Sequence, residues 1–278
     1  MATGLRLNTN HRQTTNYIST MEVHAHSHTA RKKWTHYLWE FLMLFLAVFC
    51  GFLAENFREH QVEHQRAKLL AKNLYKELYT DSVSIQRCLA NRVIKESECA
   101  YFINYVKDSN LTVLSKRFFP SFASALIQVQ YIIFEPNDGI LNQLKNSGEL
   151  RYFKSDELQA EIGNLSVKIA YVRTRNDKEY SYIEFYHRPF VLKHFDFDWY
   201  EEFTRNGTIP LVKALNEKMY VANTGTLGNA ANFSRLEAQN IASYSLLMLR
   251  STRLIQYKEY TEANHRVMEL LRKEFHLD

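Results

Sequence analysis

The sequence predicts an all-α protein with one N-terminal transmembrane helix, which continues into a long stalk and an extramembrane antiparallel helical bundle. Only eight Gly and four Pro occur in 278 residues, so few positions favour tight turns or short strands. One apolar run near the N-terminus is long enough to cross a bilayer. Elsewhere apolar residues recur at steps of three and four, which is the periodicity of amphipathic helices.

Residues 1–33 form a polar tail with a histidine tract and a basic triplet. His24, His26 and His28 alternate, and a flexible chain can bring their neutral imidazoles around Zn, Cu or Ni. They are the candidate metal ligands, and no other cofactor is expected. Because residues 1–20 are polar and without helical periodicity, one hypothesis is that translation starts at Met21 and leaves them untranslated.

Residues 34–54 are the predicted transmembrane helix. Phe41 to Ala54 carries no charge but reaches only about 21 Å; starting at Trp34 gives about 31 Å, which matches a hydrocarbon core of about 30 Å. Glu40 lies inside this span. We expect its carboxylate to pair with His36 near the membrane surface, and the alternative is an intramembrane contact with a second membrane protein.

Cleavage of the anchor is the weaker alternative. A signal-peptidase site after Ala54 has Phe52 where a small residue is needed, and a lipoprotein site at Cys50 has Phe49 before the cysteine. For orientation, the basic triplet at 31–33 and the short tail favour a cytoplasmic N-terminus with residues 55–278 outside.

A long amphipathic helix follows the anchor between residues 55 and 110, which contain neither Gly nor Pro. A break is expected near "YTDS", residues 79–82. The expected apolar positions are Leu70, Leu74, Leu78, Ile85, Leu89, Val93, Ala100 and Ile103. An apolar helical stretch over 115–134 starts near Pro120, and a short helix closes at Gly148.

Ser155 is a predicted helix start, because its hydroxyl can accept from free backbone amides. Beyond it ten positions alternate three and four apart: Leu158, Ile162, Leu165, Ile169, Val172, Asn176, Glu179, Ile183, Tyr186 and Phe190. This pattern predicts a bundle or coiled-coil helix, ended or kinked by Pro189. Asn176 and Glu179 are the polar residues in this seam. They indicate either that the helix leaves the core there or that Asn176 fixes its register, and a buried polar ligand site is the less favoured alternative.

The C-terminal third contains an irregular segment and a last helix. The segments "DFDWYEEFTRNGTIP" (196–210) and "MYVANTGTLGNAANFS" (219–234) are expected to be irregular, with Asp196 and Asp198 in a packed loop rather than a catalytic carboxylate pair. Residues 234–275 form an amphipathic helix whose expected apolar face includes Leu236, Ile241, Tyr244, Met248 and Ile255.

Charge and motifs limit the functional classes. Of the net charge of +5, residues 1–54 carry +3, and no basic stripe with interleaved aromatics follows, so no nucleic-acid partner is expected. "HQVEH" matches the H-x-x-E-H pattern, in which His60 and His64 bind zinc and Glu63 acts as general base. Its position on a stalk near the membrane favours a solvated polar surface instead.

The segments "MEVHAHSH" (21–28), "RKKWTHYLWEFLMLFLAVFCGFLAENFREH" (31–60) and "LNQLKNSGELRYFKSDELQAEIGNL" (141–165) resemble a family of uncharacterised single-pass membrane proteins from Bacteroidetes bacteria. The resemblance implies a bacterial cytoplasmic (inner) membrane protein that starts at the methionine corresponding to Met21. It also implies one anchor followed by a helical domain. It carries no activity or catalytic residues.

The expected function is therefore a membrane-anchored, non-enzymatic helical module for interaction or sensing, with its C-terminal domain in the periplasm. Its partners are the lipid bilayer and a protein partner, or a second copy through helical seams. Two alternatives stay open: metal handling by the His24, His26 and His28 tract, and zinc-dependent hydrolysis at "HQVEH".

Overall fold

The structure is a computed structural model that describes residues 33–127, 132–205 and 225–277. Within these ranges every regular element is a helix and there are no strands, which confirms the predicted all-α fold. The chain divides into two units, residues 1–58 and 59–278. The boundary falls within the first helix.

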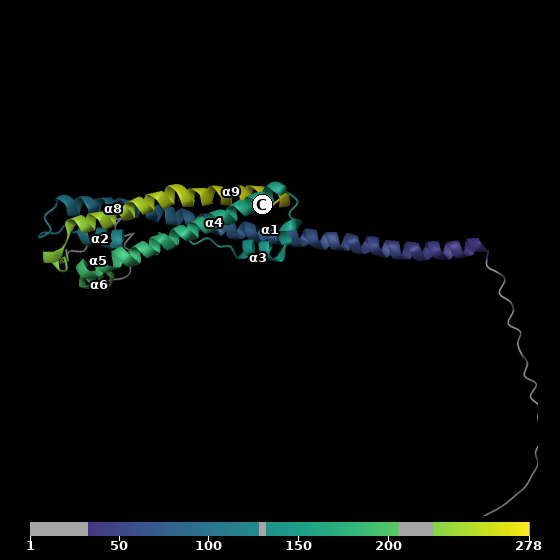
Figure 1. The fold of residues 1–278 in the computed structure, drawn as a ribbon, viewed down its shortest axis with the longest axis horizontal. Helices are drawn as coiled ribbons and strands as arrows, with labels where there is room; N and C mark the ends of the chain where they lie inside the picture. Colours follow the sequence, from purple (N-terminus) through teal and green to yellow (C-terminus); the bar gives the residue numbers. More distant parts are fainter. Residues whose placement is uncertain (1–32, 128–131, 206–224, 278) are drawn as a thin grey trace, which may run out of the picture. The chain divides into compact units, whose positions relative to one another are not determined.

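Figure 1 shows the described elements along the chain. The α-helices are α1 (Trp34–Asp108), α2 (Phe118–Leu126), α3 (Gly139–Ser147), α4 (Asp156–Tyr182), α5 (Arg188–His194), α6 (Phe197–Arg205), α8 (Arg235–Ser251) and α9 (Lys258–Phe275). Short 3-10 helices are η1 (Glu149–Tyr152) and η3 (Ala230–Asn232), and π-helices are η2 (Ile183–His187) and η4 (Thr252–Tyr257).

The described part of the first unit is the N-terminal end of α1. By length and composition, α1 is the one described helix that is apolar enough to span a membrane. None of the described residues up to Arg58 is buried within the chain. Glu40 lies 3.0 Å from His36, which confirms the expected pairing one turn apart. Phe41, Phe45 and Phe49 stack along one face.

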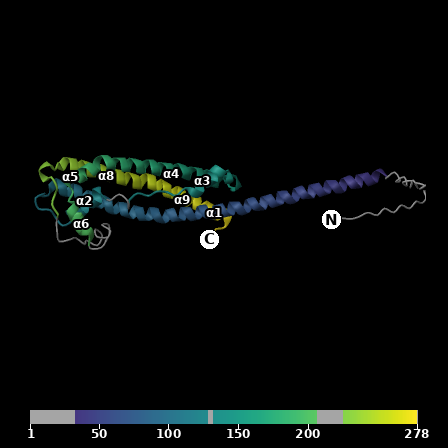
Figure 2. The ribbon, with the colours of Figure 1, turned by 90° about the horizontal axis from the view of Figure 1, so that it is seen from below.

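The second unit is built on three long helical segments. The part of α1 after Arg58 and α4 run in the same direction, and α8 and α9 return antiparallel to both (Figures 1 and 2). Helix α4 packs along α9, while the shorter helices lie at the two ends of the bundle. Helix α2 lies at one end of the bundle and α3 at the other, where α4 begins.

Two separate apolar cores fill this unit. The first core, formed by α1, α3, α4 and α9, includes Leu70, Leu74, Leu78, Ile85, Leu144, Leu158, Ile162, Leu165, Ile169, Val267 and Leu271. The second core, formed by α1, α2, α5, α6 and α8, includes Cys99, Phe102, Phe118, Phe119, Phe122, Phe190, Phe195, Trp199, Ala238 and Ala242. The second core is richer in aromatic rings, which pack edge to face and tilted.

The helix ends follow the expected local chemistry. Ser155 Oγ accepts from the amide of Leu158 at 3.1 Å, and Ser234 caps α8 in the same way through the amide of Glu237 at 3.2 Å. Gly148 follows α3 with a left-handed backbone (φ 72°), as predicted.

The predicted break at residues 79–82 is wrong. Helix α1 is continuous there, because the polar side chains bond within the helix instead of ending it. Thr80 Oγ1 donates to the carbonyl of Lys76 at 2.9 Å, and Ser82 Oγ donates to the carbonyl of Leu78 at 3.1 Å.

Two other boundaries differ from the sequence prediction. The stretch after Pro120 is helical only to Leu126, and Phe134 instead lies in the first core without regular structure. Residues from Phe197 form α6 rather than an irregular loop. Asp196 makes this possible, because its carboxylate accepts from the amide of Trp199 at 2.8 Å and from that of Thr226 at 2.7 Å.

The π-helix η2 changes the seam of the long helix after Glu179. A π-turn inserts one extra residue, so His187 is buried where the regular spacing predicts Tyr186, which is 56% exposed. Pro189 explains the position of this turn. In a regular α-helix its ring would clash with the carbonyl of Phe185. The proline therefore does not end the helix, which continues as α5 to His194.

The second π-helix, η4, interrupts the C-terminal helix between α8 and α9. The expected apolar face is correct for Ile241 and Met248, but Leu236, Tyr244 and Ile255 are exposed. The inward positions are taken instead by small and polar residues such as Ala238, Ala242, Ser245 and Thr252.

Candidate functional site

A layer of buried polar residues separates the two apolar cores. We call it the ionic layer, and its members are Arg92, Lys95, Asn176, Glu179, His187, Ser245, Thr252 and Tyr257. Each long helix contributes: α1 carries Arg92 between Cys88 of the first core and Cys99 of the second. Both π-helices lie at this level, since His187 belongs to η2 and Thr252 and Tyr257 belong to η4.

Arg92 is the centre of the layer. Its Nη1 and Nη2 donate to the two oxygens of Glu179 at 3.2 and 2.7 Å. Its Nε donates to the carbonyl of Ile132 at 2.7 Å, and Nη1 also reaches the carbonyl of Leu249 at 3.3 Å. The guanidinium lies over the ring of Tyr257, 4.6 Å from its centroid. One side chain therefore joins α1, α4, α8 and the connection before α3.

The burial of Arg92 opposes its charge, but the Glu179 carboxylate outweighs this and raises the pKa of Arg92. A buried ion pair seldom adds much net stability, because desolvation consumes most of the attraction. Losing one partner is costly, since the other charge then stays buried alone. The pair therefore fixes which residues face each other more than it adds to the free energy of unfolding.

Polar contacts extend from Glu179 to the turn that opens η4. Thr252 Oγ1 donates to Glu179, and Arg175 Nε donates to Thr252 Oγ1 at 2.7 Å. Arg175 Nη2 also donates to the carbonyl of Met248 at 3.1 Å. With Arg92 on the carbonyl of Leu249, two arginines thus donate to main-chain oxygens in the last turn of α8, both of which also accept from the amide of Thr252.

A small cavity of about 20 Å³ lies beside the layer, between Lys95, Glu179, His187 and Ser245. This is room for about one water molecule. His187 Nδ1 bonds the carbonyl of Leu126 at 3.1 Å, so Nε2 accepts from Ser245 Oγ at 2.5 Å. Burial, with the charge of Lys95, lowers the pKa of His187 to about 3. Burial also lowers the pKa of Lys95 to about 8.

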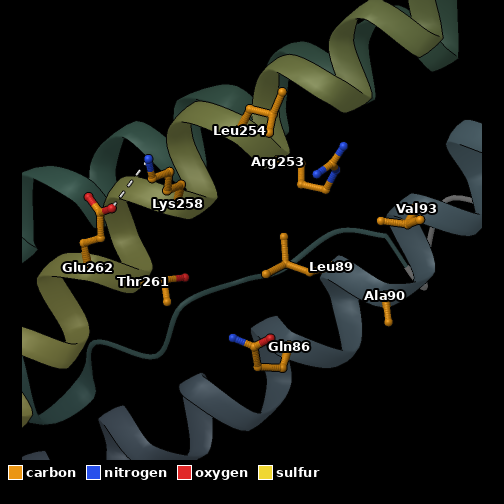
Figure 3. Close-up of a pocket in the computed structure, with 9 residues that line it drawn as sticks. All are labelled: Gln86, Leu89, Ala90, Val93, Arg253, Leu254, Lys258, Thr261 and Glu262. Atoms are coloured by element: carbon orange, nitrogen blue, oxygen red, sulfur yellow. Dashed lines mark ion pairs between the residues drawn. The ribbon is translucent and has the colours of Figure 1, made fainter.

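An open groove of about 580 Å³ runs along the outside of the same helices (Figure 3). Its lining comes from α1 on one side and from η4 and α9 on the other: Gln86, Leu89, Ala90, Val93, Arg253, Leu254, Lys258, Thr261 and Glu262. Val93 and Leu254 are 52% and 56% exposed, so large apolar side chains face solvent from both walls. This surface can take an apolar ligand.

The groove and the ionic layer are opposite faces of the same helical turns. On α1, Arg92 points into the layer and Val93 lines the groove; on η4, Thr252 faces the layer while Arg253 and Leu254 line the groove. Arg253 also closes the space between the walls, because its Nε and Nη2 donate to the carboxylate of Glu96 at 2.7 and 2.9 Å. A change in η4 must therefore affect both faces.

The candidate metal and hydrolase residues of the sequence do not belong to this site. His24, His26 and His28 lie outside the described residues, so metal binding there stays a prediction. At "HQVEH", His60 Nδ1 lies 3.5 Å from Glu63, and both histidines are exposed. Among the described residues, no group of three or more His, Cys, Asp or Glu side chains is placed to hold a metal ion.

Of the ionic layer, only Asn176 and Glu179 stand out in the sequence, as polar residues in an apolar seam. Both are buried, so the helix does not leave the core there. Arg92 and Lys95 were missed because Leu89 and Val93 look like the better seam positions. The signal that would have found them is the steady frame Leu78, Asp81, Ile85, Cys88, Arg92, Lys95, Cys99, Phe102 and Val106, all buried.

Comparison of the chain with protein-family models, curated proteins and solved structures finds no match.

Proposed function

We propose that this chain is a membrane-anchored, non-enzymatic helical module that binds a protein partner in the groove between α1 and η4–α9. The observation that carries the proposal is the open apolar lining of that groove, with Leu89 and Val93 on one wall and Leu254 on the other. Exposed apolar surface bordered by charged side chains is typical of interaction sites.

The anchor in this proposal is the exposed apolar part of α1, residues 34–54. Its length and composition suit a bilayer, and its Trp and Tyr residues gather at the N-terminal end, where interfacial aromatics belong. We place the protein in a bacterial cytoplasmic membrane, in the family it resembles, with its N-terminus inside and the helical unit in the periplasm. The support for this placement is the resemblance and the basic triplet at 31–33.

The occupant we propose is an amphipathic helix of the partner protein. A groove between two helices, with apolar side chains on both walls, accepts such a helix, whose apolar residues recur at steps of three and four. Lys258 in the lining favours an acidic residue beside those anchors, whereas Arg253 is already bonded to the carboxylate of Glu96. Lys258 and Glu262 are 3.8 Å apart and mostly exposed, so a partner carboxylate can compete for the lysine at little cost.

Site-specific photocrosslinking in intact membranes tests this proposal. A benzoylphenylalanine at Val93 or at Leu254 should give the same adduct, and Val93→Glu should abolish the adduct formed from position 254. Val167 is the matched control, because it is 48% exposed on α4 and outside the groove lining. Equal adducts at all three positions, or none at the groove positions, would exclude the groove as a docking site.

Protease accessibility tests the orientation separately. In intact spheroplasts, an added protease should cleave the helical unit and leave the N-terminal tail protected. Protection of the helical unit together with cleavage of the tail would indicate the opposite orientation, with the helical unit in the cytoplasm.

A further inference from the structure

We propose that η4 is a conformational device that regulates the groove. The contacts from the ionic layer hold it as a π-helix with the groove open, and their loss lets it relax to an α-helix. This inference concerns the regulation of the groove and rests on the proposed function for its biological role. Its structural content stands on the contacts of η4 alone.

The first argument is that η4 has no proline to hold it in the π form. In η2, Pro189 enforces the wider turn, but residues 251–258 of η4 contain neither Pro nor Gly. An isolated π-turn costs free energy relative to an α-helix and persists where other contacts favour it. The form adopted by η4 is therefore set by its tertiary contacts.

The second argument identifies those contacts. The carbonyls of Met248 and Leu249 accept from Arg175 at 3.1 Å and from Arg92 at 3.3 Å. Thr252 donates to Glu179, and Tyr257 at the other end of η4 donates to Asn176 at 3.2 Å. All of these bonds come from side chains of the ionic layer or its border, so the layer holds both ends of η4.

The third argument concerns what the α form does to the groove. Removing the extra residue of the π-turn rotates α8 relative to α9 by about 100°, the angle of one helical residue. Arg253 and Leu254 then leave their present positions opposite Val93, and the Glu96–Arg253 pair has to open. Because Arg253 and Leu254 are the η4 part of one wall of the groove, the occupant binds the π form more tightly than the α form. Binding therefore stabilises the layer, and loss of the layer weakens binding.

Distance measurement between spin labels tests the device without any partner. The full chain with Cys50→Ser, in lipid nanodiscs, carries labels at Val93→Cys and Leu254→Cys; Cys88 and Cys99 are buried and stay unlabelled. We expect one distance population in this background. A second population should follow from Glu179→Gln and from Thr252→Val, each of which weakens the hold on η4. Labels at Leu69→Cys and Glu269→Cys, on α1 and α9 away from η4, should keep a single population throughout.

One unchanged population for the 93–254 pair in both folded variants would overturn the proposal. Where Glu179→Gln loses cooperative unfolding, Thr252→Val decides, because it removes one hydroxyl and leaves no buried charge unpaired. The result is independent of crosslinking at the groove. A shift of the 93–254 distance without any partner adduct would support the conformational change in η4 and exclude the proposed docking role. An adduct without a shift would support the docking role and exclude the conformational change.

Discussion

Arg92 on α1 and Glu179 on α4 form a two-bonded ion pair whose side chains are 0% and 4% exposed. The pair sits where the first core ends and the second begins, so it joins α1 to α4 between two apolar regions. Ion pairs on the surface of the same unit have no such role, because solvent and salt screen them.

Removing one partner of this ion pair should lower the free energy of unfolding more than replacing both partners by apolar residues. Arg92→Met leaves the buried Glu179 carboxylate without its two-bonded partner, with only Thr252 and, at 3.8 Å, Arg175 beside it, and should lower the free energy of unfolding by about 3 kcal/mol. The double variant Arg92→Met with Glu179→Leu should recover much of that loss, since no charge remains buried. Urea unfolding of the two single variants and the double variant measures the difference.

The matched control for that cycle is the exposed pair of Arg188 and Glu184, one turn apart, with side chains 62% and 51% exposed. Arg188→Ala should leave the unfolding midpoint unchanged within error. A double variant as unstable as Arg92→Met alone would show that the pair contributes through packing rather than charge.

His187 should make stability fall as the pH falls. Its pKa drops from 6.5 in the unfolded chain to about 3 in the folded protein, so the folded state disfavours the proton. Its contribution is complete above pH 6.5 and is lost between 6.5 and about 3. In that window the free energy of unfolding of wild type should fall relative to His187→Gln, by at most about 1.4 kcal/mol per pH unit.

Unfolding of both proteins at pH values from about 7 to 4.5 gives this difference, and carboxylates common to both cancel. His265→Gln, which removes an exposed histidine on α9, serves as the control. Parallel curves for wild type and His187→Gln would mean that the imidazole is not held neutral inside the protein.

Two glycines should respond oppositely to alanine. Gly163 lies exposed within α4 with open space around it, so Gly163→Ala should stabilise by about 0.5–1 kcal/mol. Gly148 has a left-handed backbone after α3, so Gly148→Ala should destabilise by about 1 kcal/mol although space is also available. Thermal unfolding of both variants checks this. The same sign for both would contradict the conformation at residue 148.

The sequence predicts the long helices and their caps well, because these depend on local periodicity and on single residues such as Ser155. It predicts the seam of α4 down to Glu179 because every seam position there is either apolar or visibly exceptional. The predicted seam is wrong after Ile183, because the periodicity of the sequence does not show that η2 inserts one extra residue. The residue that signals it is Pro189, from which the sequence predicts either a helix end or a kink.

The candidate site is the part that local pattern predicts least. Arg92 and Lys95 resemble ordinary surface residues, and they are buried only because partners from α4 and η4 meet them. The groove exists for the same reason: Val93 and Leu254 are apolar residues on the outer faces of helices that happen to lie opposite each other. Such residues are identified by tertiary arrangement rather than by spacing along one helix.

Thiol labelling within α1 tests most directly the claim that the module is anchored in a membrane. In native membranes with Cys50→Ser, a membrane-impermeant maleimide should fail to label Leu44→Cys, in the middle of residues 34–54, until detergent is added. Leu69→Cys, exposed on the same helix beyond the anchor, should be labelled from the outer side without detergent. Labelling of Leu44→Cys at the rate of Leu69→Cys in intact membranes would contradict the anchor.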